Sequence, residues 1–207
     1  SSSKIIKESQ PDLSLIKIKS LLEGERLSIN KIRTFVDKFK NTPVFVLGDS
    51  IIDTYIQTDL IGNNAKTPTF STRYIDETKY VGGAAIIAKH LSKAGAKVTF
   101  CSILGNDKLG KYIKRDLKKN NISDETLELN FRPTTDKKYF IADNYRLLKV
   151  DTVDNSPISQ DIINKITNKI KRIKKGILIF ADFRHGIFNK NSIPGFIKAI
   201  NSGVFKV

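Results

Sequence analysis

The stretch PVFVLGDSIID, residues 43–53, decides the fold of this 207-residue chain. Its first five residues are apolar apart from the leading proline, and their β-branched and aromatic side chains predict a buried strand over residues 44–47. Two carboxylates, Asp49 and Asp53, follow at the carboxyl end of that strand. Ligands of open α/β sheets bind outside the carboxyl ends of the strands, so both carboxylates are candidate ligand contacts. For Asp49, a structural hydrogen bond or a cap is an equally good interpretation.

A second motif, VGGAA at residues 81–85, opens a helical pattern about thirty residues later. Gly82 and Gly83 allow the backbone to pass close to a ligand, and the helix that follows exposes N–H groups that attract oxygen-rich ligands. A simple tight turn is the alternative for these two glycines. Together the two motifs predict the floor of a binding site for an oxygen-rich ligand.

Strands and helices alternate along the rest of the chain, which predicts a parallel sheet covered by helices on both faces. Residues 203–207 indicate a turn that enters one more strand. The expected strands are residues 44–47, 97–104 and 176–180, and the expected helices are residues 84–94, 109–120, 159–174 and 193–200.

Two segments depart from this alternation. Residues 54–58 with 69–80, and residues 136–142 with 145–152, alternate polar and apolar side chains with a period of two. This pattern predicts two antiparallel hairpins, which form a small sheet lying over the crevice or over a dimer partner. Such a lid would exclude water from a site of phosphoryl transfer.

The first 42 residues form a helical extension that precedes the α/β pattern. Apolar residues between Ile29 and Phe39 fall on one helical face after a Ser28 cap, and the helix ends before Asn41-Thr42-Pro43. We therefore expect two parts, residues 1–42 and residues 43–207.

The composition excludes several classes of protein. Hydrophobic residues make up 40% and charged residues 28%, which are ordinary globular values, and no apolar run reaches the roughly 18 residues needed to span a bilayer. No secretory signal precedes the first strand, so we expect a cytoplasmic setting without membrane contact. The single cysteine, Cys101, lies in an apolar run and is expected to be a buried, inert thiol.

The net charge of +15 could attract nucleic acid, but the lysines are scattered over helical segments such as residues 108–119. An anionic small substrate accounts for the charge equally well, and we expect no nucleic-acid partner.

The chain contains five ordered motifs: GDSIID at 48–53, GGAA at 82–85, GNDKLG at 105–110, RPTTDK at 132–137 leading to LLKVD at 147–151, and ADFRHG at 181–186. In order and spacing they resemble the N-terminal half of ribokinase-type (phosphofructokinase B) sugar kinases. Within that family they are most similar to the heptose 7-phosphate kinase domain of ADP-heptose synthesis enzymes. The resemblance implies a Rossmann-like ribokinase fold, N-terminal part only, over residues 43–207, with lid strands near 54–80 and 136–152.

The resemblance also implies roles for individual residues. Asp53 would hold sugar hydroxyls, Gly82 and Gly83 would let the lid hinge, and Lys137 would contact a substrate phosphate. Asp49 is the remaining candidate for substrate binding. One departure concerns the sugar, because Ile86 stands where the family usually has asparagine.

On the nucleotide side, Asp182 would lie near the nucleotide phosphates or magnesium. His185 and Arg132 have structural alternatives, as a hydrogen-bonded histidine and as a residue that fixes a loop. We assign no catalytic residue and no metal ligand set to this chain. The family's Gly-Ala-Gly-Asp motif with the general-base aspartate is absent, and we expect it beyond Val207.

The expected activity is transfer of the ATP γ-phosphate, with Mg²⁺, to a heptose 7-phosphate for nucleotide-sugar synthesis, by a homodimer paired through the lid. Alternatives are another pentose, hexose or nucleoside kinase, and a non-catalytic sugar- or nucleic-acid-binding protein. We expect the chain to be the sugar-binding part of a longer protein and to be inactive alone. Residues 1–6, SSSKII, resemble the end of a nucleotidyltransferase domain, although a cloning remnant is an equal alternative.

Overall fold

The computed structural model describes residues 13–63 and 69–207, and the SSSKII segment lies outside them. The chain divides into two compact units after Lys40. The first unit contains α2 (Leu13–Gly24) and α3 (Ile29–Lys38). As predicted, Ser28 caps α3, because its hydroxyl accepts the Lys31 N–H at 3.1 Å.

The second unit is built on a five-stranded sheet in which every neighbouring pair is parallel. The order of its strands confirms the predicted parallel architecture, and the strand expected within residues 203–207 is present. From edge to edge the strands are β11 (Val204–Lys206), β10 (Gly176–Ala181), β1 (Pro43–Gly48), β4 (Lys97–Cys101) and β6 (Ser123–Asp124).

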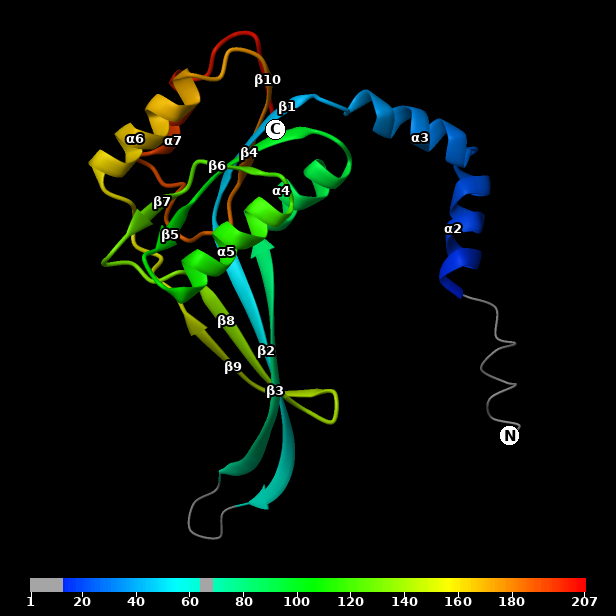
Figure 1. Ribbon diagram of the computed structural model, residues 1–207, viewed down its shortest axis with the longest axis vertical. Coiled ribbons are helices and arrows are strands. Elements are labelled where there is room, and N and C mark those ends of the chain that lie inside the picture. The colour runs from blue at the N-terminus through cyan, green and yellow to red at the C-terminus, as the bar shows by residue number, and fades with distance from the viewer. Residues whose placement is uncertain (1–12, 64–68) are drawn as a thin grey trace. The chain divides into compact units, whose positions relative to one another are not determined.

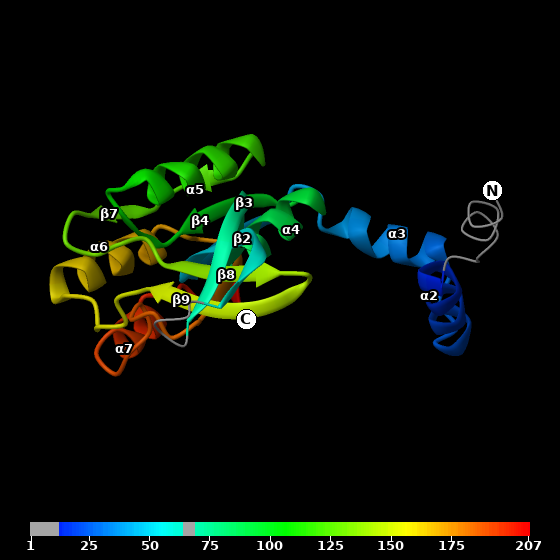
Figure 2. The same cartoon turned by 90° about the horizontal axis from the view of Figure 1, so that it is seen from below.

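Helices cover both faces of this sheet, as Figures 1 and 2 show. Side chains of β1 alternate between two cores: Val44 and Val46 pack with α4 and α5, whereas Phe45 and Leu47 pack with α6 and α7. A strand buried on both faces explains the continuous apolar run in the sequence. The four helices are α4 (Ala84–Lys93), α5 (Lys108–Lys119), α6 (Gln160–Lys171) and α7 (Ile193–Lys198).

The lid is a separate four-stranded sheet that projects from the α/β body (Figure 1). Both predicted antiparallel hairpins are confirmed. They are joined by a parallel pairing of β2 with β8, which the sequence pattern did not indicate, and β2 begins already at Ser50. In order, the lid strands are β3 (Phe70–Gly83), β2 (Ser50–Asn63), β8 (Asp136–Ala142) and β9 (Tyr145–Thr152).

The predicted strand over residues 97–104 is wrong in one respect, because two strands occupy it. β4 ends at Cys101, and β5 (Ile103–Gly105) pairs with β7 (Leu127–Leu129) in a two-stranded sheet. The break falls at buried Ser102, whose hydroxyl accepts the Ser50 N–H at 3.1 Å and so connects the break to the root of the lid. The Cys101 thiol beside it is buried, which raises its pKa to about 12 and leaves it unreactive.

Helix ends differ slightly from the expectation: α6 ends at Lys171 rather than at residue 174, and α7 ends at Lys198 rather than at residue 200. Among the helices of residues 13–63 and 69–207, none is long and apolar enough to cross a membrane.

Candidate functional site

The site lies at the carboxyl ends of β1 and β10, where the two strands end side by side. Gly48 pairs with Ala181, and a Cβ atom at Gly48 would lie 2.3 Å from the carbonyl oxygen of Ala181. Only glycine therefore allows this close approach. Asp49 directly follows β1, and Asp182 directly follows β10.

Asp49 is almost fully buried, and its carboxylate accepts hydrogen bonds from the backbone of the loop that follows β10. Its Oδ2 accepts the N–H groups of Phe183 at 2.9 Å and of His185 at 3.3 Å. Burial raises the pKa of the Asp49 carboxyl, and these two hydrogen bonds counteract the increase. The structure thus gives Asp49 the structural hydrogen bonds that the sequence left as one of its two interpretations, and its role in substrate binding stays a prediction.

Asp53 lies four residues further, on β2, with its carboxylate fitted against Gly82 of the neighbouring strand. A Cβ atom at Gly82 would lie 2.6 Å from Asp53 Oδ2, so the missing side chain provides the space for the carboxylate. In the sheet register Asp53 pairs with Tyr80 on β3 and with Lys137 on β8. The predicted acceptor residues Asp53, Gly82 and Lys137 are therefore brought together at the root of the lid.

Gly83 ends β3 and caps α4 with a left-handed backbone, at φ +59°. A Cβ atom here would lie 2.4 Å from the carbonyl oxygen of Asp49, and that same oxygen accepts the Ala84 N–H at 2.9 Å. Gly83 is required by this geometry, which places the first turn of α4 against the end of β1.

Lys137 lies on β8 of the lid, close enough to the loop after β10 for its charge to act on His185. Lys137 itself is half-buried. Burial is the main cause that lowers the pKa of His185, the negative charge of Asp49 opposes this, and the positive charge of Lys137 adds to the lowering. His185 Nδ1 lies 2.7 Å from the side-chain oxygen of Asn155, and its Nε2 is buried without a hydrogen-bond partner. An imidazole in this setting is held neutral, which agrees with the structural alternative for His185.

The loop that follows β10 is held in an unusual conformation. Asp182 is exposed, and its Oδ1 accepts the Arg184 N–H at 2.7 Å, while Arg184 itself has a φ of +64°. Gly186 has a φ of +90°, where a Cβ atom would lie 2.1 Å from the carbonyl oxygen of Ser156. Asp182 is thus an exposed carboxylate on a fixed turn, and its role near nucleotide phosphates or magnesium stays a prediction.

Arg132 holds the loop after β10 in place, because it is buried and its guanidinium group donates hydrogen bonds to three acceptors. It donates to the carbonyl oxygen of His185 at 3.3 Å, to the Ser156 carbonyl, and to the Ser156 hydroxyl at 2.9 Å. Asp154 lies 3.4 Å from Nε and supplies the counter-charge. The interpretation of Arg132 as a residue that fixes a loop is confirmed.

A hollow of about 350 Å³ lies beside Asp53 on the lid and is lined by tyrosines that the sequence analysis did not single out. The rings of Tyr55 and Tyr139 stack with centroids 5.1 Å apart, and Tyr80 meets Tyr55 edge to face at 5.7 Å. The period-two pattern already places Tyr55 on the same face as Asp53, and this signal could have found it. The hollow itself is lined by Asp53, Tyr55, Gln57, Thr78 and Tyr80.

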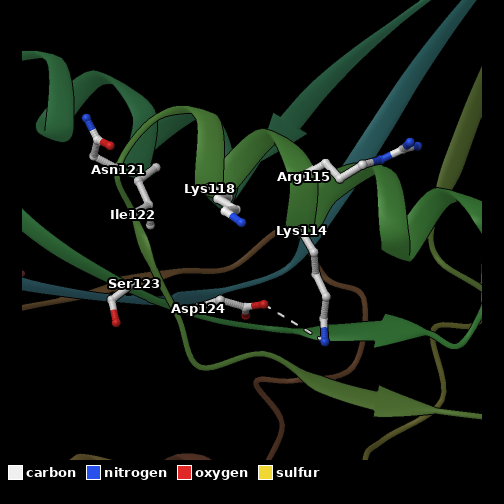
Figure 3. Close-up of a pocket in the computed structure, with 7 residues that line it drawn as sticks. All are labelled: Lys114, Arg115, Lys118, Asn121, Ile122, Ser123 and Asp124. Atoms are coloured by element: carbon white, nitrogen blue, oxygen red, sulfur yellow. Dashed lines mark ion pairs between the residues drawn. The ribbon is translucent and has the colours of Figure 1, made fainter.

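The most voluminous of the described hollows, about 580 Å³, is elsewhere, between α5 and β6 (Figure 3). It is basic, but Lys114 is neutralised by Glu128 at 2.5 Å and by Asp124 at 3.9 Å. Arg115 and Lys118 are the other cations that line it. No candidate site residue borders this hollow, and the basic side chains on the solvent-facing side of α5 account for its positive charge.

Metal-binding clusters were also sought in the described part of the chain, and no group of three or more His, Cys, Asp or Glu side chains lies together there.

Comparison with known proteins gives one family. The model described as "pfkB family carbohydrate kinase" matches residues 41–170. The chain is 27% identical to the bifunctional protein HldE of Paramagnetospirillum magneticum over 157 residues, covering 73% of this chain and 32% of that protein. It is 32% identical to the protein of the same name from Helicobacter pylori over 153 residues, covering 70% and 32%. The chain thus spans about a third of the length of the curated relatives it matches.

Solved structures share the fold. Phosphofructokinase-2 from Escherichia coli in complex with fructose-6-phosphate aligns with a TM-score of 0.61 at 16% identity, covering 80% of this chain and 54% of that one. Ribokinase from Giardia lamblia aligns with a TM-score of 0.58 at 14% identity, again over 80% and 54%. With a family model that matches more than half of its residues and with this fold, the chain belongs to the pfkB family of carbohydrate kinases.

Proposed function

We propose that this chain is the sugar-binding part of an ATP-dependent kinase that phosphorylates a heptose 7-phosphate for nucleotide-sugar synthesis. The observation that carries the proposal is the Asp53 carboxylate, which is fitted over Gly82 at the root of the lid, in register with Lys137 on the neighbouring strand. A carboxylate can accept hydrogen bonds from two neighbouring sugar hydroxyls, and the adjacent ammonium group supplies a charge for the substrate's phosphate.

Each side of the site has its own task in this proposal. On the acceptor side, Asp53 and Lys137 orient the sugar, and the lid excludes water that would compete with the sugar hydroxyl. On the donor side, Asp182 stands on its fixed turn where the phosphates of ATP and Mg²⁺ would bind. When bound, Mg²⁺ neutralises the charge of the transferred phosphoryl group.

The heptose is supported by the sequence motifs and by curated relatives named HldE. A sugar phosphate as the ligand class is supported by the fold of a neighbour whose structure contains fructose-6-phosphate. Other pentose, hexose or nucleoside acceptors remain the alternative within the same family.

A homodimer through the lid is part of the proposal. The outer part of the lid exposes large apolar side chains, and a hollow of about 480 Å³ lies among them. Phe70 is 70% exposed and Leu148 is 56% exposed, which a second copy of the sheet would cover.

Isothermal titration of the chain with heptose 7-phosphate, fructose 6-phosphate and ribose tests the proposed function. We expect binding of the heptose phosphate, and Asp53→Asn should weaken it about 30-fold or more, because hydrogen bonds to a charged group are lost. Asp76→Asn is the matched control, since Asp76 is an exposed carboxylate on the same lid sheet. If no sugar phosphate binds, or if the two variants lose affinity equally, the proposed function is wrong.

A further inference from the structure

Tyr139 lies diagonally across the lid sheet from Asp53. Asp53 pairs with Lys137, and Tyr55 pairs with Tyr139, so all four side chains point to one face of the sheet. The Tyr139 hydroxyl donates to Asp53 Oδ1 over 3.4 Å. A diagonal pair of this kind lies within reach of a long aromatic side chain.

The ring of Tyr139 is fixed from two sides. Tyr55 stacks on it with an angle of 23° between the ring planes. The Arg146 guanidinium lies 4.8 Å from the ring centroid, and Lys149 Nζ lies 5.9 Å from it. Because stacking and cation–π contacts hold the ring, the direction of its hydroxyl group is fixed as well.

The Asp53 carboxylate is therefore bounded at both oxygens. Oδ2 occupies the space that a side chain at Gly82 would fill, and Oδ1 faces the phenol of Tyr139.

We propose that Tyr139 is a positioning residue, which holds the Asp53 carboxylate in the orientation that binds the acceptor's hydroxyl groups. This inference rests on the proposed function of Asp53 as the acceptor-binding carboxylate. Burial is the main cause that raises the pKa of Tyr139, and the negative charge of Asp53 raises it further. The phenol therefore remains a hydrogen-bond donor at neutral pH.

Two variants that remove one hydroxyl group each test the proposal. Tyr139→Phe keeps the stack and removes the donor to Asp53, and we expect affinity for heptose 7-phosphate to fall about 5- to 10-fold. Tyr74→Phe is the matched control, because it removes a hydroxyl group from an exposed tyrosine of the same lid sheet outside the hollow beside Asp53, and its affinity should change less than about 2-fold. Equal affinity of Tyr139→Phe and the unmodified chain would overturn the proposal, as would an equal loss in both variants.

A second readout follows the contact itself and does not depend on ligand. Ultraviolet titration of tyrosinate, with Tyr139→Phe to identify the signal, should show that Asp53→Asn lowers the pKa of Tyr139. If Tyr139 does not contact the Asp53 carboxylate, it titrates alike in both backgrounds, which contradicts the proposal.

The outcomes separate the two proposals. If Asp53→Asn loses affinity while Tyr139→Phe does not, only the positioning role fails. If Asp53→Asn binds the heptose phosphate like the unmodified chain, the proposed function fails and the positioning role fails with it.

Discussion

Replacing Gly82 by alanine adds one methyl group at the place where the Asp53 carboxylate lies. The new Cβ atom would stand 2.6 Å from Asp53 Oδ2, whereas ordinary contact begins at 3.4 Å, so the carboxylate must move by about 0.8 Å. The carbonyl oxygen of Ile51 is 3.7 Å away and needs no adjustment. The strain therefore falls on the end of one side chain, which rotates at little cost.

From this geometry we expect Gly82→Ala to damage binding far more than folding. Displacing a ligand-binding group by nearly an ångström should weaken heptose 7-phosphate binding about 10- to 50-fold, or roughly 1.4 to 2.3 kcal/mol. The free energy of unfolding should fall by less than about 1 kcal/mol, because only a flexible carboxylate is displaced.

Calorimetric titration and urea denaturation measure the two effects on the same samples. Gly195→Ala is the control, since a Cβ atom there meets only the Thr167 hydroxyl, at 3.9 Å. Unchanged affinity in Gly82→Ala would refute the placement of Asp53 in the acceptor site. A loss of stability that matches the loss of affinity would refute the claim that the strain is local.

Three further changes test the frame around the site. Thr54→Val removes the buried hydroxyl that donates to Asp136 at 2.6 Å, and urea denaturation should show a loss of about 1 to 3 kcal/mol, which Thr54→Ser restores in part. The lowered pKa of His185 predicts stability that is complete above its ordinary pKa of 6.5 and is lost as the pH falls through the folded-state pKa. His185→Gln should reduce the change of the urea midpoint between pH 7.5 and pH 5; a midpoint that changes as much as in the unmodified chain contradicts the assignment. Arg132→Lys keeps the positive charge but loses the hydrogen bonds of the guanidinium group, so the free energy of unfolding should fall by about 2 to 3 kcal/mol. An unchanged urea midpoint would contradict the role of Arg132 in fixing the loop.

Local patterns in the sequence predicted most of the elements. The apolar run of β1 indicated a strand buried on both faces, and the alternation in residues 136–152 indicated a hairpin, because each pattern reports the faces that a strand buries. The parallel pairing of β2 with β8 joins residues more than eighty positions apart, and no local period contains that information. Ser102 likewise has a strand-like sequence around it, and only its bond to Ser50 explains the break.

In the candidate site, too, local sequence patterns predicted some features, and contacts between distant segments determine the others. Position relative to a strand end was enough to single out Asp49 and Asp53, whereas Asp182 was pointed to by the resemblance to sugar kinases. The sequence could not tell that the Asp49 carboxylate accepts hydrogen bonds from a loop 134 residues away, because this depends on which strand lies beside β1. Tyr139 was missed for a related reason, since its relation to Asp53 exists only across the β2–β8 junction.

Asp49 has one more consequence, for how the two halves of the site move. Its carbonyl oxygen accepts the first N–H of α4 beside the root of the lid, and its carboxylate holds the loop that carries Asp182. Asp49 thus links the start of α4, beside the root of the lid, directly to the loop that carries Asp182. If the lid closes over the acceptor as proposed, the movement would reach this loop through Asp49, so binding of the acceptor would change the place proposed for the nucleotide phosphates.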